Sequence, residues 1–268
     1  MGVLISSILF PGDPALVGVA ITSLLLLPEL YKIFDIEERQ ESMAQKVTLG
    51  ELWKDDINLV KVYVAIFLGI MLVYSVGTML IPNMQANTLF REQLEIRFGQ
   101  GFSGQAVSGF FSDGLFLLFW ELLSNNFMVL MACFILALLT GDGAIFLISW
   151  NASVWGTIFG VTAKYASAFS GHHIVYLFVL IMLIVFPHMI LEAISYFLAA
   201  ISGSMISKDV ILEEFASNKF FEVFGFNFYL FIFGLIFLIL GALVEAFVLQ
   251  NVTFYQDIIQ MSMMAMGG

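Results

Sequence analysis

The stretch Ile174–Ser207, IVYLFVLIMLIVFPHMILEAISYFLAAISGSMIS, is almost entirely apolar. A single helix of this length would extend about 51 Å, whereas the hydrocarbon layer of a bilayer is about 30 Å thick. A proline inside a helix removes one hydrogen bond and clashes with the preceding turn. We therefore expect the helix to break at Pro187 into two shorter pieces. Whether the stretch crosses the membrane once or twice stays open.

Five more stretches on either side are long and apolar enough to span a bilayer, which takes about 20 residues. They are Ala15–Tyr31, Val62–Ile81, Leu115–Leu139, Ala144–Ala163 and Tyr229–Leu249. The first residues, Met1–Phe10, are apolar but too short to span, so they are either an interfacial helix or the stub of a truncated span. The fold class that follows is all-α, a polytopic transmembrane helical bundle with about six membrane segments.

Composition excludes several other classes of protein. Hydrophobic residues make up 60% of the chain and charged residues 12%, whereas soluble domains have about 45–50% and about 25%. Ten basic against 21 acidic residues leave no basic patch for nucleic acid. The single cysteine, Cys133, excludes a disulfide framework within one chain. We expect a lipid bilayer as partner and no nucleic acid, metal or other cofactor.

The chain divides into two regions. Residues 1–61 contain an N-terminal membrane segment and a hydrophilic, helical cytoplasmic loop at 32–61. Residues 62–268 form the membrane domain, which includes a polar extracytoplasmic loop at 82–113. This division follows the change from charged to apolar composition.

The distribution of basic residues predicts the orientation of a multi-pass protein of the cell membrane. Loop 32–61 carries five Lys and Arg residues, and the tail after Leu249 carries none. Because basic loops stay in the cytoplasm, we place loop 32–61 inside and the tail outside. The remaining connections alternate: 140–143 and 208–228 lie inside, and 82–113 and the turn around Lys164–His173 lie outside. This orientation requires one net crossing by the long stretch.

Polar side chains inside the predicted spans are the candidate functional residues, because such groups are expensive in a bilayer. They are Glu121, Asn125, Asn126, Asn151, His188 and Glu192. No Lys or Arg lies deep in a span to neutralise the acids. His188 and Glu192 are four residues apart and share a helix face, so we expect both to face the interior and contact one of the amides. They form either a polar core for protons or ions, or an interhelical clamp. Glu245 lies near a span end, where we expect it to reach the membrane surface.

Small residues repeat every four positions on two spans. One series is Ala152, Gly156 and Gly160, and the other contains Ala199 and Gly203. Such series let two helix backbones approach closely and pack through dispersion contacts. They predict either packing within one chain or the seam of a dimer.

Two motifs resemble parts of catalytic sites, but neither has the surroundings that such a site needs. Gly101–Gly104, GFSG, fits the pattern of intramembrane serine proteases, but its serine lies in a polar loop and not at a helix start within the membrane. His172 and His173 are adjacent, so their side chains point to different faces of a helix. We expect that the protein is not an enzyme.

Four patterns in order carry a family resemblance. They are Asn125-Asn126; Trp150-Asn151-Ala152-Ser153 followed by Gly156 and Gly160; Pro187-His188 with Glu192; and Gly241-Ala242-Leu243-Val244-Glu245-Ala246-Phe247. Over about residues 110–250 the chain resembles the stage II sporulation protein M family, and its N-terminal part and loop 82–113 resemble the archaeal branch. That family has glycine after Pro-His, whereas this chain has Met189.

The resemblance implies an integral membrane protein. In spore-forming bacteria the family member is a membrane scaffold for cell-wall hydrolases, a role that archaeal relatives without such a wall cannot share. Two functional hypotheses remain. The first is a scaffold or assembly subunit, a homodimer with other membrane proteins as possible partners. The second is an ion- or proton-coupled transporter or channel with a polar core at His188 and Glu192.

Overall fold

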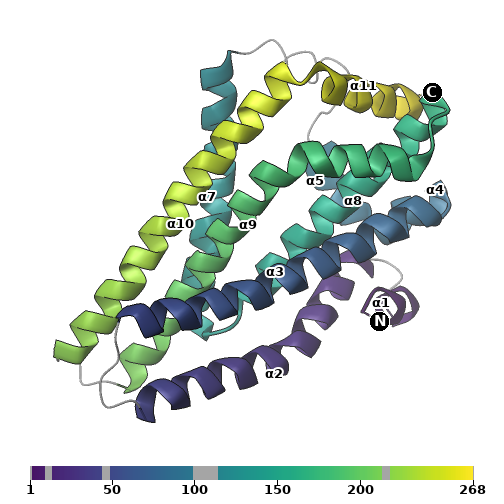
Figure 1. Cartoon of the computed structure of the whole chain (residues 1–268). Helices are drawn as coiled ribbons and strands as arrows, with labels where there is room; N and C mark the ends of the chain where they lie inside the picture. The colour runs from purple at the N-terminus through teal and green to yellow at the C-terminus, as the bar shows by residue number, and fades with distance from the viewer. Residues whose placement is uncertain (1, 10–13, 44–48, 99–113, 213–217, 268) are drawn as a thin grey trace.

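The computed structural model describes residues 2–9, 14–43, 49–98, 114–212 and 218–267. Every element in these ranges is an α-helix (Figure 1). The helices are α1 (Gly2–Leu9), α2 (Pro14–Met43), α3 (Leu49–Leu80), α4 (Asn83–Leu89), α5 (Arg91–Phe98), α7 (Leu115–Thr140), α8 (Ala144–Ser170), α9 (Ile174–Leu212), α10 (Asn218–Asn251) and α11 (Thr253–Gly267).

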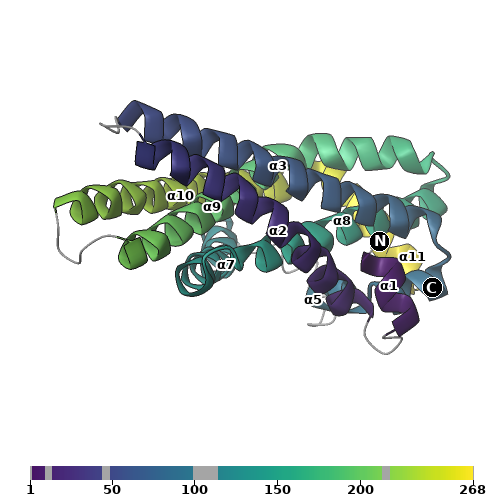
Figure 2. The same cartoon turned by 90° about the horizontal axis from the view of Figure 1, so that it is seen from below.

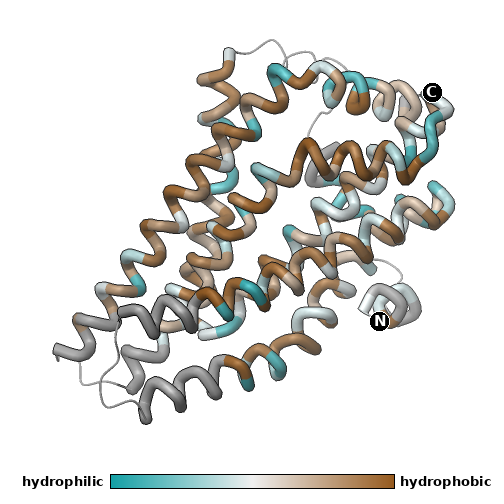
Figure 3. Tube along the Cα trace, viewed as in Figure 1, coloured by the Kyte–Doolittle hydropathy of each residue, from teal (hydrophilic) through white to brown (hydrophobic). Residues whose placement is uncertain are grey.

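Six of these helices are long and apolar enough to cross a membrane within the described part of the chain. The spans are Pro14–Ile33, Ile57–Leu80, Leu115–Thr140, Ala144–Ser170, Ile174–Ser207 and Phe224–Asn251. Hydrophobic residues dominate α9 and α10 along most of their length (Figure 3). The prediction of an all-α polytopic bundle with about six membrane segments is therefore confirmed.

The predicted break at Pro187 is wrong. Helix α9 continues from Ile174 to Leu212 with the proline inside it. Figure 1 shows that the helix changes direction part-way along its length. Proline kinks a helix without ending it when neighbouring helices hold both arms, and α9 packs against α7, α8 and α10. A bend thus fits the long helix into the bundle.

Helix α9 runs from one end of the bundle to the other. Lys164 of α8 donates hydrogen bonds to the carbonyl oxygens of Thr78 and Ile81, so the C-terminal ends of α3 and α8 lie together. Helix α9 starts beside that end and finishes at the opposite end of the bundle, and α11 packs on α8 (Figure 1). The orientation of the protein in the membrane stays a prediction.

Two glycines follow the C-terminal ends of α7 and α8. Gly141 follows α7 with a φ of 76°, and Gly171 follows α8 with a φ of 74°. The left-handed region is easily reached only by glycine, which makes it the usual residue at a helix end. The amide of Gly171 donates to the carbonyl of Ser167 at 2.9 Å and closes the last turn of α8.

The region predicted as polar loop 82–113 contains two short helices that fold back onto the bundle. Gln93 of α5 is fully buried, and its Nε2 donates to Oγ of Ser153 in α8 at 3.3 Å. Figure 2 shows α5 beneath α8. Residues 99–113, including the serine motif at Gly101–Gly104, lie outside the described residues. The boundary at residue 61 falls inside α3, and the division into two regions stays a prediction.

The small-residue series are used for packing within the chain. Ala152 is fully buried, and a Cβ added at Gly156 would collide with the backbone of Met71 in α3. One added at Gly160 would lie 2.6 Å from the carbonyl oxygen of Ser75. Of the two interpretations of these residues, intrachain packing is the one that the structure supports.

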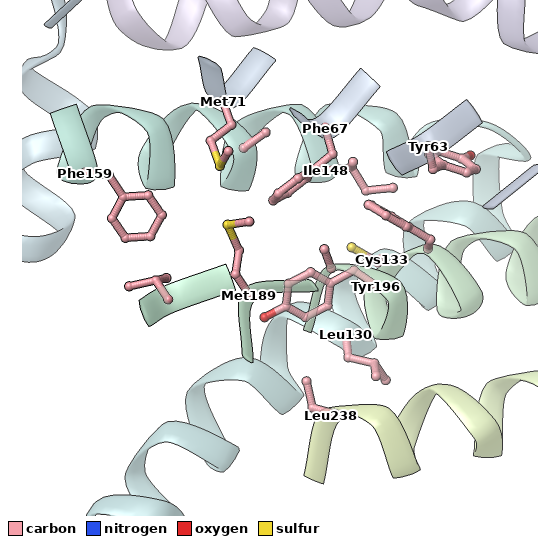
Figure 4. Packing of buried hydrophobic residues seen from close by; sticks show 14 of the residues in the cluster. Tyr63, Phe67, Met71, Leu130, Cys133, Ile148, Phe159, Met189, Tyr196 and Leu238 are labelled. Carbon is pink, nitrogen blue, oxygen red and sulfur yellow. The ribbon is translucent and has the colours of Figure 1, made fainter. Parts of the chain in front are cut away.

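The second small-residue series, on α9, also packs against a helix of the same chain. Ala199 is fully buried. A Cβ added at Gly203 would lie 2.5 Å from the carbonyl oxygen of Phe134 in α7. The hydrophobic core lies between these interfaces, and Figure 4 shows part of it. Its buried residues include Phe67, Leu130, Ile148, Tyr196 and Leu238.

Candidate functional site

The two ionisable residues after Pro187 face the interior of the bundle. Glu192 is 2% exposed and His188 is 6% exposed. They lie one turn apart on the face of α9 that meets its neighbours, and Ser195 continues the buried face, donating to the carbonyl of Glu192 at 2.6 Å. The i, i+4 spacing in an apolar helix is what turns both side chains inward.

Glu192 meets polar side chains from two other helices. The side chains of Asn126 from α7 and Glu245 from α10 are near enough to interact with its carboxyl group. Asn126 is itself buried. We call these three residues the three-helix junction. It joins α7, α9 and α10 through side chains that lie far apart in the sequence.

A glycine makes room for this contact. Gly241 lies one turn before Glu245 on α10, and a Cβ added to it would lie 2.8 Å from Cγ of Glu192 and 3.4 Å from the Glu192 amide nitrogen. A larger residue would displace the glutamate side chain. The motif Gly241-xxx-Glu245 therefore works as a unit, because the first residue allows the approach and the second supplies the carboxyl.

The junction has more acceptors than donors. Oε1 of Glu192 is buried and has no hydrogen-bond partner. The amide of Asn126 is a neutral donor, and a carboxyl donates only when it is protonated. Burying an acceptor without a partner costs about 1–3 kcal/mol. An arrangement of this kind can bind a proton or a hydrogen-bond donor, which makes the junction the candidate functional site.

The other candidate residues lie elsewhere. Glu121 and Asn125 are exposed on α7, and Asn125 Nδ2 donates to Asn126 Oδ1 at a long 3.5 Å. Asn151 is half-buried and donates to the carbonyl of Leu147 in its own helix at 2.9 Å. The structure thus brings Glu192 and Asn126 together but leaves Glu121 and Asn151 outside the junction.

Two residues of interest were not identified correctly from the sequence. Glu245 was expected at the membrane surface, but it is half-buried and directed at Glu192. Its position four residues after a glycine is the signal that could have revealed it. Gln93 was missed because its segment is polar throughout, and no periodicity marks one buried residue there.

Other buried polar groups join helices away from the junction. Ser204 of α9 donates to Oδ1 of Asp142 at 3.2 Å, in the turn between α7 and α8. Ser202 donates to the carbonyl of Asn227 in α10 at 2.6 Å. These contacts fasten the other arm of α9. Within the described residues, no group of three or more His, Cys, Asp or Glu side chains is arranged to hold a metal.

Six apolar helices joined by buried polar contacts define a polytopic α-helical membrane protein. A model of the family "SpoIIM: Stage II sporulation protein M" matches residues 15–249. The chain belongs to this family. Comparison with curated proteins gives no match, and neither does comparison with solved structures. The matched range starts well before residue 110 and therefore also includes α3 and nearly all of α2.

Proposed function

We propose that the protein is a non-enzymatic scaffold or assembly subunit of the cell membrane and that it works as a homodimer. The observation that carries the proposal is the outer face of α7, whose exposed residues include polar ones within a span. This face consists of Leu117, Glu121, Ser124, Asn125, Met128, Ile135 and Leu139.

Polar groups on a lipid-facing surface are unfavourable. An acidic residue at the centre of a span costs about 2.5–3.5 kcal/mol on insertion scales, and Glu121 lies nearer the end of its span than the centre. Trp120 contacts Phe116 and Phe119 beside Glu121, and aromatic residues gather where a helix meets the headgroups. Asn125 lies one turn deeper, where water cannot solvate its amide. A partner covering this face would supply the missing hydrogen bonds.

A second copy of the chain suits this surface. An amide is both donor and acceptor, so two Asn125 side chains can pair across a two-fold axis, and asparagines promote helix association in membranes. The small-residue series are occupied by α3 and α7 within one chain, so a dimer needs another surface. The outer face of α7 is free for that purpose in the described part of the structure.

Cysteine cross-linking in native membranes tests the proposal. In a Cys133→Ala background, Met128→Cys should form cross-linked dimers, whereas Ile236→Cys, which is exposed on α10, should not. Adding Asn125→Leu should remove the Met128→Cys product, and Asn125→Gln should preserve it. Dimers from the α10 position alone, or none from either, would contradict the proposed interface.

One observation favours a second function, ion- or proton-coupled transport. Glu192 and Glu245 place two carboxyl groups in contact inside the bundle, and such acids in membrane proteins often belong to proton pathways. Proton flux in proteoliposomes separates the hypotheses. Transport predicts flux that Glu192→Gln abolishes while the protein stays folded, and a scaffold predicts no flux from either form.

A further inference from the structure

The contact between Glu192 and Glu245 has a chemical requirement of its own. Glu192 of α9 and Glu245 of α10 are near enough to interact, and both lie within membrane spans. Gly241, one turn before Glu245, holds α10 against the Glu192 side chain. Two ionised carboxylates offer only acceptors and repel each other. A proton shared between them turns this repulsion into a hydrogen bond.

We infer that Glu192 and Glu245 form a proton-binding site at membrane depth, in which one proton is shared by two carboxyl groups and Asn126 orients the acceptor. The inference goes beyond the proposed scaffold role and does not depend on it. A site of this kind binds protons whether or not they cross the membrane.

The burial of Glu192 supports the same site. The residue is 2% exposed, and no described donor hydrogen-bonds to its Oε1. A buried carboxyl oxygen without a donor is costly when the group is ionised. A proton on the carboxyl pair removes that cost.

The surroundings leave the carboxyl pair without a cationic partner of the lysine or arginine type among the described residues. On α9 itself, His188 lies one turn before Glu192 and Tyr196 one turn after it. Tyr196 interacts with both carboxyls and with Cys133 of α7. Phenol and thiol groups are neutral near pH 7. Among these neighbours, a proton on the carboxyl pair or on His188 is what can offset the repulsion between the two acids.

A carbodiimide provides a direct chemical test, because it adds to a protonated carboxyl group in apolar surroundings and forms a stable acylurea without a leaving group. The full chain in liposomes is treated with dicyclohexylcarbodiimide and mapped by mass spectrometry. We expect an adduct on Glu192 or Glu245 that falls about tenfold per pH unit on the alkaline side, as for one titrating group. Glu95, which is exposed outside the spans and paired with Arg91, should stay unmodified.

Infrared spectroscopy of the wild-type protein covers the case in which packing blocks the reagent. A protonated carboxyl band should be present near neutral pH, should disappear on alkaline titration, and should be missing from the Glu192→Gln/Glu245→Gln double variant. The glutamines keep the size and hydrogen-bonding of the pair, so this variant should fold. Absence of the band from the folded wild-type protein would overturn the inference, whatever the carbodiimide result.

Discussion

The interface between α3 and α8 and the three-helix junction both depend on a glycine. They differ in the polar groups that meet there. In both, a glycine lets a neighbouring helix approach: Gly156 faces the backbone of Met71, and Gly241 faces the side chain of Glu192. At the first interface the polar contact is neutral and satisfied, since Ser75 Oγ donates to the carbonyl of Gly156 at 2.9 Å. At the second it joins two acids and leaves Oε1 of Glu192 unpaired. Close packing alone thus does not identify a functional site, whereas an unsatisfied ionisable group within it does.

The largest effect is expected at the α3–α8 interface. Gly156→Leu should lower the free energy of unfolding by about 3 kcal/mol, because the new side chain collides with backbone, which cannot move aside. Gly69→Leu is the matched control, because nothing lies within 4 Å of a Cβ at that position of α3. The control should change stability by no more than about 0.5 kcal/mol. Denaturation of the reconstituted protein by a harsh detergent measures both, and equal effects would remove the distinction between the two positions.

The next largest effect is expected at Glu192, where two variants test whether the polar contacts of the three-helix junction hold its helices together. Glu192→Leu should cost about 1–3 kcal/mol, because it leaves the buried polar groups of Asn126 and Glu245 without their partner. Glu192→Gln should cost much less, since an amide still donates and accepts. The same detergent titration compares them. A leucine variant as stable as the glutamine variant would show that the junction makes no net contribution to holding the helices together.

The sequence predicts what depends on composition and local spacing. Apolar length identifies the six spans, and the i, i+4 spacing of His188 and Glu192 gives their shared inward face. The spans themselves need no tertiary information, because each backbone in a bilayer must satisfy its own hydrogen bonds.

What the sequence did not predict depends on neighbouring helices. The position of Glu245 along α10 does not show which residue faces it across the interface. The polar composition of α5 hides Gln93, because burial there is decided by Ser153 of α8. At Pro187 the local rule predicts a break, whereas packing on both arms maintains one bent helix. Tertiary contact decided each of these outcomes.

A smaller effect is expected where α8 fastens the end of α3. Lys164 donates to the carbonyl groups of Thr78 in α3 and of Ile81 directly after it, and Lys164→Met keeps the aliphatic chain while it removes the donor. The loss should be about 1 kcal/mol, the net contribution of typical hydrogen bonds. Lys61→Met is the control, because that lysine is exposed and contacts Asn58 of its own helix. Thermal aggregation should distinguish the two variants, and a shift no larger at Lys164 than at Lys61 would speak against the contact.

Gly241→Ala should change the free energy of unfolding least of these variants. It should nevertheless alter the interaction between the Glu192 and Glu245 carboxyl groups. The added methyl would lie 2.8 Å from Cγ of Glu192, so the glutamate side chain must move away from Glu245. Alanine favours a helix over glycine by about 1 kcal/mol, which offsets most of the crowding. The free energy of unfolding should therefore stay close to that of the wild type. The infrared band of the protonated carboxyl should shift towards that of a carboxyl without a partner.

Gly234→Ala tests whether that shift is specific to the acids. Its Cβ would lie 3.1 Å from the carbonyl oxygen of Ser195, at the same α9–α10 interface but away from the carboxyl pair. The neighbour here is a backbone carbonyl and not a side chain, but at 3.1 Å the crowding is milder than at Gly241. The change in stability should therefore also be small, and the carboxyl band should not move. An unchanged band in Gly241→Ala would show that the acids do not depend on the close approach of α10. A shifted band in both variants would assign the effect to helix separation and not to the contact between Gly241 and Glu192.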